Sequence, residues 1–152
     1  ALHFSGQPVS EIYADDSAVI ELDRDIDISR GDIFVPVGET VRKSALFSAR
    51  LTHLDTAALK LNYAYYLMCG TRKVKAMVKS INSKLDIHSL KFNAGGEANA
   101  VALNEIAEVT IKTAQPIVFD SYRDNWTTGA AVLVDAQTNM TSAALMHNEA
   151  ID

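Results

Sequence analysis

The feature that most constrains this sequence is a strict two-residue alternation of apolar and polar side chains. In residues 72–79 the apolar Val74, Ala76 and Val78 alternate with three lysines, at positions 73, 75 and 79. Residues 106–112 repeat the pattern with different apolar residues. Successive side chains of a β-strand point to opposite faces, so this period predicts strands with one buried and one solvated face.

Residues 115–135 (QPIVFDSYRDNWTTGAAVLVD) hold two short apolar runs separated by a polar loop. The runs lack strict alternation, which is typical of strands buried on both faces or of strands that close a barrel. The loop, residues 120–129, is rich in turn-forming residues. It also brings together the large polar and aromatic side chains Tyr122, Arg123, Asn125 and Trp126.

Several other segments carry turn and strand signals. Residues 1–16 are predicted to be mainly loop, and residues 17–22 a half-buried strand. A short strand is expected at 33–35, followed by a linker at 36–42 with Pro36 and Gly38. The period of residues 45–61 fits a strand and a helix equally well. Further strands are expected at 63–69 and 140–147, and a surface loop at 93–99. About eight strands after the linker, with turns at short intervals, indicate an all-β antiparallel barrel or sandwich.

Composition narrows the function. The chain has 152 residues, 48% hydrophobic and 22% charged, as expected for a folded domain. Its net charge of −5 argues against a protein that binds a nucleic-acid backbone. A single cysteine, Cys69, with no signal peptide and no long apolar run, predicts a cytoplasmic protein that is not in a membrane.

Motifs for catalysis or cofactor binding are not found in the sequence. There is no phosphate-binding loop and no dinucleotide-binding glycine pattern. The four histidines share no metal-ligand spacing with one another or with Cys69. Asp120 and Asp124 are interpreted as turn caps, and residues 30–32 (RGD) as a tight turn. We therefore predict no catalytic, cofactor-binding or metal-binding residue.

Residues in the same order and spacing as a known family occur over about residues 17–145. Residues 25–32 (DIDISRGD) resemble the end of the second domain of translation-factor-like GTPases. Residues resembling their third domain are 70–72 (GTR), 103–106 (LNEI), 116–122 (PIVFDSY), 128–129 (TG), Asp135 and 138–141 (TNMT). Among such GTPases, elongation factor Tu included, the spacing of Asp120, Tyr122 and Asn125 and the TNMT tail are most similar to the large subunit of bacterial two-subunit sulfate adenylyltransferase.

Four positions depart from the pattern of that family. Ala107 replaces a glycine, Trp126 replaces an arginine, and residues 142–144 (SAA) replace a glycine-rich stretch. Asn62 stands where a turn glycine is expected, and asparagine tolerates the left-handed conformation.

The resemblance implies a closed antiparallel β-barrel, the third domain of the family, over residues 37–152. Residues 1–36 would be the last strands of a second barrel, with a GTPase domain upstream. Residues 45–54 would then be a strand. Because a partial barrel has an unpaired edge, we expect residues 1–16 to be mobile or paired with another molecule.

The function implied by the resemblance is that of a non-catalytic region. In the family, GTP hydrolysis with Mg²⁺ drives formation of adenosine 5′-phosphosulfate from ATP and sulfate, and a separate small subunit catalyses the transfer. The barrel would contact its own GTPase domain and that subunit, with Tyr122, Arg123, Asn125 and Trp126 as interface candidates. Two alternatives remain: Tyr122 and Trp126 could instead pack over a barrel end, and the chain could be a translation-factor barrel that binds RNA or a protein.

Overall fold

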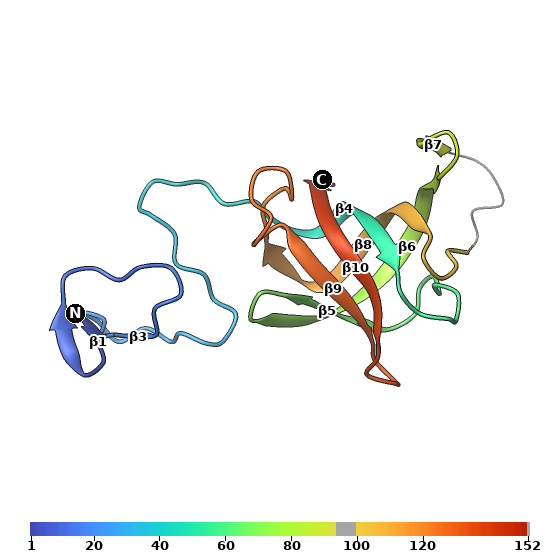
Figure 1. The fold of residues 1–152 in the computed structure, drawn as a ribbon. Helices are drawn as coiled ribbons and strands as arrows, with labels where there is room; N and C mark the ends of the chain where they lie inside the picture. Colours follow the sequence, from blue (N-terminus) through green and yellow to red (C-terminus); the bar gives the residue numbers. More distant parts are fainter. Residues whose placement is uncertain (94–99, 152) are drawn as a thin grey trace.

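The computed structural model describes residues 1–93 and 100–151, which form two antiparallel sheets (Figure 1). The first sheet has three short strands in the order β2-β1-β3. Its strands are β1 (Leu2–Phe4), β2 (Gln7–Val9) and β3 (Ala18–Ile20). The second sheet has seven strands in the order β5-β9-β10-β4-β8-β6-β7. Its strands are β4 (Lys43–His53), β5 (Tyr65–Cys69), β6 (Arg72–Asp86), β7 (Lys91–Asn93), β8 (Ile106–Val118), β9 (Ala130–Asp135) and β10 (Thr141–Ala150).

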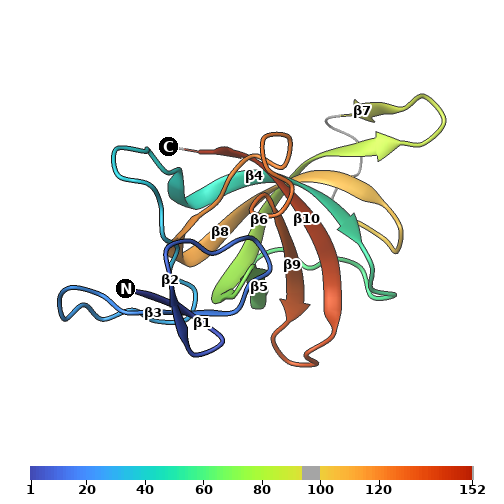
Figure 2. The same cartoon turned by 60° about the vertical axis from the view of Figure 1, so that its left-hand side comes forward.

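The large sheet closes on itself. Strand β5 pairs with β9 on one side and with β6 on the other, so six strands form a closed antiparallel barrel. Beyond the barrel, β6 continues outward and pairs with the short β7 (Figure 2). The predicted all-β barrel is therefore confirmed, and closure removes the free edges that an open sheet would present.

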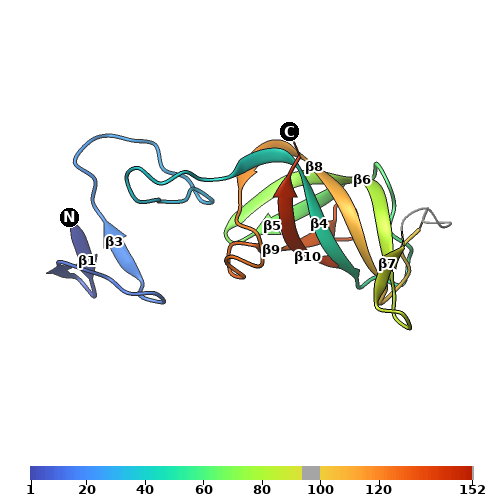
Figure 3. The same cartoon turned by 90° about the horizontal axis from the view of Figure 1, so that it is seen from above.

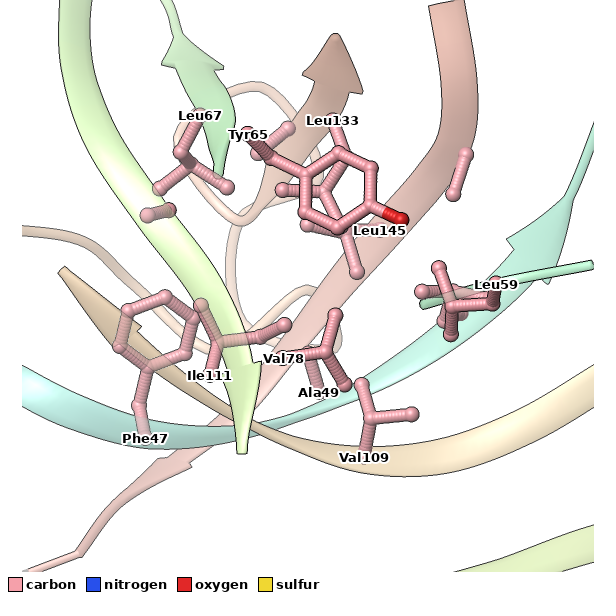
Figure 4. Close-up of a cluster of buried hydrophobic side chains, with 14 of the residues drawn as sticks. Phe47, Ala49, Leu59, Tyr65, Leu67, Val78, Val109, Ile111, Leu133 and Leu145 are labelled. Carbon is pink, nitrogen blue, oxygen red and sulfur yellow. The ribbon is translucent and has the colours of Figure 1, made fainter. Parts of the chain in front are cut away.

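The core lies inside the barrel (Figure 4). Alternate residues of each strand point inward, as predicted for Val74, Ala76 and Val78. Phe47 and Leu51 of β4 are completely buried, which resolves the ambiguity at residues 45–61 in favour of a strand. The turn after that segment contains Asn62 with φ 52°, the left-handed conformation expected at this position.

Strand β8 is longer than the sequence suggests. The predicted strand at 106–112 and the apolar run at 116–118 belong to this one strand, so seven strands follow the linker in the described residues. Pro116 does not end it because the pairing with β4 is irregular there, between Ser44 and Leu46. A proline without an N–H group is tolerated where the ladder is already interrupted.

The N-terminal sheet corrects the expectation for residues 1–16. Residues 2–4 and 7–9 of this stretch are strands paired within the chain, because β1 pairs with β2 and with β3, whereas residues 10–16 form no strand. The hairpin turn uses Ser5 and Gly6 at φ 50° and 77°, the positive values that a tight two-residue hairpin requires. The Ser5-Gly6 pair therefore indicates a β-hairpin and not an irregular loop.

Burial of the N-terminal segment was also predicted incorrectly. Strand β3 exists, but Val19 and Ile20 are 66% and 45% exposed, so it is not half-buried. Residues 33–35 do not form a strand. Residues 21–42 contain no strand and carry the chain across to the barrel (Figure 3).

Two predictions are not decided by the structure. The predicted loop at 93–99 lies, except for Asn93, outside the described residues. Whether residues 1–36 and 37–152 are separate domains of a larger protein stays a prediction.

Candidate interface loop at one end of the barrel

The loop between β8 and β9 starts from a buried aromatic anchor. Phe119 is 1% exposed, and its ring centroid lies 4.9 Å from those of Phe47 and of His147. Phe119 thus packs against rings from β4 and β10, and this contact fixes the point at which the chain leaves the core. The loop lies at the barrel end where β4 begins, because Lys43 pairs with Val118.

Backbone hydrogen bonds make this loop compact. The Asn125 N–H donates to the Ser121 carbonyl at 3.0 Å, and the Gly129 N–H donates to the Asn125 carbonyl at 2.8 Å. Two further bonds attach the loop to β10: Tyr122 N–H donates to the His147 carbonyl at 2.9 Å, and His147 N–H donates to the Gly129 carbonyl at 2.8 Å. The loop is therefore held in one shape by its own backbone and by its neighbour.

Gly129 is required by close packing. A Cβ atom at this position would lie 2.5 Å from the Tyr122 Cα and 2.6 Å from the Asn125 carbonyl oxygen. Both of those atoms belong to the backbone, which cannot swing aside as a flexible side chain can. A side chain here would therefore force the two ends of the loop apart.

The four predicted interface residues are all exposed, and one of them also bonds within the loop. Trp126 is 71% exposed and Tyr122 is 38% exposed, and Arg123 is also exposed. Asn125 bonds within the loop, since its Oδ1 accepts the Thr127 N–H at 3.0 Å. Trp126 is too exposed to be a plug over the barrel end. Whether any of the four contacts a partner stays a prediction.

An open groove of about 700 Å³ runs beside the loop, over the outer faces of the barrel strands. Tyr122 and Arg123 line one part of it, and Arg50 and Glu108 line another. The guanidinium of Arg50 lies 3.5 Å from the Glu108 carboxylate and packs over the Phe92 ring at 4.7 Å. The alternation of β4 and β8 indicates that Arg50 and Glu108 point outward, but only the strand register brings them together.

The aspartates and the cysteine near the loop have structural contacts. Asp120 accepts a hydrogen bond from the Thr128 hydroxyl at 2.5 Å, and Asp124 lies 3.8 Å from the Arg42 guanidinium. Cys69 donates to the Thr128 carbonyl at 3.6 Å, and burial raises the pKa of its thiol. A thiol with a raised pKa is less often ionised at neutral pH and is a poorer nucleophile.

The pKa of His147 is shifted far from its ordinary value by burial. Its ring is fully buried between Phe47 and Phe119, and neither ring nitrogen has a hydrogen-bond partner. Burial lowers the pKa of His147 from 6.5 to about 4, because the protonated ring would lose its hydration. At neutral pH His147 is therefore an uncharged packing residue.

The described part of the chain contains neither a cluster of metal ligands nor a helix that could span a membrane. Among residues 1–93 and 100–151, no three side chains of the histidine, cysteine, aspartate or glutamate types gather where they could hold a metal ion. Within the same ranges, no helix has the length and apolarity needed to cross a membrane.

Similarity to known proteins extends over nearly the whole chain. The family model described as GTP-eEF1A C-terminal domain-like matches residues 46–146. "Sulfate adenylyltransferase subunit 1" of Francisella tularensis subsp. tularensis (strain WY96-3418) is 37% identical over 145 residues, which cover 95% of this chain and 30% of that protein. "Bifunctional enzyme CysN/CysC" of Mycobacterium tuberculosis (strain ATCC 25618 / H37Rv) is 34% identical over 140 residues, 91% of this chain and 22% of that protein.

A solved structure of sup35 complexed with GMPPNP has the same fold. It superposes with a TM-score of 0.85 over 100% of this chain and 37% of that one, at 17% identity. At this identity the likeness concerns the fold alone. The chain spans less than a third of the length of the curated relatives described above.

Proposed function

Because this chain belongs to the GTP-eEF1A C-terminal domain-like family, we propose that it is the non-catalytic β-barrel region of the GTPase subunit of a sulfate adenylyltransferase. The observation that carries the proposal is the 37% identity with a sulfate adenylyltransferase subunit 1 over 145 residues. An overlap of that length exceeds the barrel and includes residues of the N-terminal sheet. Both sheets therefore belong to the region that resembles this relative.

In this proposal the reaction takes place outside the chain. GTP and Mg²⁺ bind to an upstream GTPase domain, and ATP and sulfate react on a small catalytic subunit in the cytoplasm. The described residues contribute a rigid scaffold, since a barrel closed by β5–β6 pairing resists deformation and presents its loops in fixed positions. This chain alone neither hydrolyses GTP nor forms adenosine 5′-phosphosulfate.

The loop between β8 and β9 is the part of the scaffold that we propose meets another protein surface. Trp126, Tyr122 and Arg123 project from it, and these three residue types are enriched in protein interfaces. Binding to a preformed loop costs little conformational entropy, because hydrogen bonds already order its backbone. Asn125 acts indirectly, by holding the turn that presents Trp126.

A domain exchange tests the proposal. The corresponding region of the Francisella tularensis subunit 1 is replaced by this chain, and the chimera is mixed with the small subunit of the same enzyme. We expect a stable complex that forms adenosine 5′-phosphosulfate in a GTP-dependent manner. A second chimera carries the sup35 region, which shares the fold at 17% identity, and we expect it to fail. The proposal is wrong if the first chimera hydrolyses GTP but does not bind the small subunit.

A translation-factor barrel is the second candidate function. The description of the matching family model favours it. Against it stands the net charge of −5, since backbone contacts to RNA need a basic surface. Filter binding with tRNA separates the two candidates. Micromolar binding that weakens steeply with salt supports the translation-factor function, and its absence supports the sulfate-activating one.

A further inference from the structure

One glycine in the N-terminal part of the chain is in a position unlike the rest. Among residues 1–42, Gly31 is the only buried residue. Its φ is 99°, in the left-handed region that side chains avoid. A Cβ atom on Gly31 would lie 3.1 Å from the Cβ and 3.2 Å from the Cα of Arg72, the first residue of β6. The backbone of the turn at 30–32 therefore rests directly on the barrel, and only glycine allows this approach.

Arg72 holds this turn from the barrel side. Its Nη1 lies 3.9 Å from the Asp32 carboxylate, and its Nη2 donates to the Gln115 Oε1 of β8 at 3.4 Å. One side chain thus connects the turn to two barrel strands. Ion pairs this exposed contribute little to stability, so the contact between the turn and the barrel is weak.

The remainder of the connecting segment adds little packing. Phe34 is 61% exposed and Val37 is fully exposed. Between the segment and the barrel an open hollow of about 470 Å³ remains, and Thr127 and Thr128 of the interface loop line part of it. A tightly packed linker would fill such a space with its own apolar side chains. Apart from Arg42, which adjoins β4 and whose carbonyl accepts the Phe119 N–H at 3.3 Å, the attachment of the N-terminal part of the chain to the barrel is therefore concentrated at the contact of Gly31 and Asp32 with Arg72.

We propose that the contact of Gly31 and Asp32 with Arg72 is a releasable latch that sets the orientation of the N-terminal sheet relative to the barrel. While it is closed, the sheet has one orientation. When it opens, residues 21–41 become a flexible tether. This latch does not depend on the proposed function, because it concerns the geometry of this chain alone.

Distance measurements between two spin labels test the latch. Labels are placed at Val19→Cys in β3 and Lys112→Cys in β8, with Cys69→Ser as background. We expect a narrow distance distribution in the parent and one at least twice as wide in Gly31→Ala. Gly38→Ala is the matched control, since Gly38 also has a positive φ of 90° but has no atom within 4 Å of its added Cβ.

The control should keep the narrow distribution. The latch is refuted if Gly31→Ala leaves the distribution unchanged, or if Gly38→Ala widens it equally.

A charge exchange tests the ion pair within the same latch. Asp32→Arg places two positive side chains together and should widen the distribution. Combining it with Arg72→Asp restores opposite charges, and we expect the double variant to recover most of the parent's narrow distribution. A double variant as wide as the single one would refute the part of the latch assigned to the ion pair. Barrel amide spectra that match the parent confirm in each case that the barrel is folded.

Discussion

The barrel and the N-terminal sheet are both antiparallel and both contain apolar strands, yet they differ in where those apolar side chains lie. In the barrel, Phe47 and Leu51 are 0% exposed, whereas Val19 and Ile20 of the small sheet are largely in solvent. A three-stranded sheet has too little surface to cover its own apolar face, and a closed sheet covers itself. The difference shows that apolar pattern creates a core only where the topology supplies an opposing surface.

The largest expected contrast is in the cost of truncating an apolar side chain. Phe47→Ala removes a buried ring that packs on Phe119 and His147, so the free energy of unfolding of the barrel should fall by about 3–5 kcal/mol. Val19→Ala should change it by less than about 0.5 kcal/mol. Denaturant titration of both variants measures the contrast. A comparable loss for Val19→Ala would mean that the small sheet shares the cooperative core of the barrel.

The buried histidine should make the barrel sensitive to acid. Because burial lowers the pKa of His147 from 6.5 to about 4, the unfolded state binds its proton first as the pH falls. Stability is therefore fully present above pH 6.5 and decreases toward pH 4, by about 3 kcal/mol in total.

Between pH 6.5 and 4.5 this loss is separable from carboxylate titration. The pKa of Glu105 is held below its ordinary 4.5, chiefly by its hydrogen bond with Lys84, so its contribution is lost only at lower pH. His147→Phe should flatten the stability curve in this window. The control is His3→Gln in the small sheet, which should leave the curve of the barrel as in the parent. If the stability curve of His147→Phe keeps the parent's slope between pH 6.5 and 4.5, His147 is not the cause of the acid sensitivity.

A glycine substitution should cost more in the barrel loop than in the N-terminal hairpin. Gly129→Ala forces a methyl group against the Tyr122 backbone and should destabilise the barrel by about 1–3 kcal/mol. Gly6→Ala meets no atom within 4 Å, so only its left-handed φ of 77° opposes it, at about 1 kcal/mol within the hairpin. Thermal unfolding reports the first effect, and amide exchange in β1 and β2 the second. Equal destabilisation of the barrel by both would contradict the close packing inferred at Gly129.

The smallest expected change in stability is at the exposed tip of the interface loop. Trp126→Ala should alter the free energy of unfolding by less than about 0.5 kcal/mol, since the ring is 71% exposed. In the chimera with the Francisella tularensis subunit 1, the same change should weaken binding of the small subunit at least tenfold, about 1.4 kcal/mol.

Met140→Ala is the matched control for Trp126, because Met140 is 65% exposed in the turn between β9 and β10. It should leave the affinity for the small subunit unchanged. Isothermal titration of both variants with the small subunit shows whether the loss of affinity is specific to Trp126 or follows from truncating any exposed apolar side chain. If Trp126→Ala lowers the free energy of unfolding but leaves the affinity for the small subunit unchanged, Trp126 is not part of the interface.

The barrel strands were predictable because the cause of the pattern is local to each strand. Val74, Ala76 and Val78 alternate with lysines because one face of β6 meets the core and the other meets water. The N-terminal sheet was not predictable in the same way. The residues of β3 are apolar like those that line the barrel, but the sequence does not reveal whether a surface exists to cover them.

The candidate site was predictable in composition but not in geometry. The positions of Tyr122, Arg123 and Trp126 in a polar loop follow directly from the sequence, and so does the turn-forming role of residues such as Asn125. The groove beside them depends on strand register, which brings Arg50 of β4 opposite Glu108 of β8. The role of Gly129 depends on the approach of Tyr122 across the loop, and no sequence period encodes that distance.

The positions at which the chain enters and leaves the barrel have a mechanical consequence. Strand β4 begins and β10 finishes at the same end, where Ala150 pairs with Phe47 (Figure 1). Tension applied between these two points loads the outermost hydrogen bonds of the β4–β10 ladder first and opens them one after another, like a zipper. The barrel should therefore unfold at a low force when it is pulled along this axis. It should need a higher force when it is pulled from points at opposite ends of one strand pair, because all the hydrogen bonds of the pair then bear the load together.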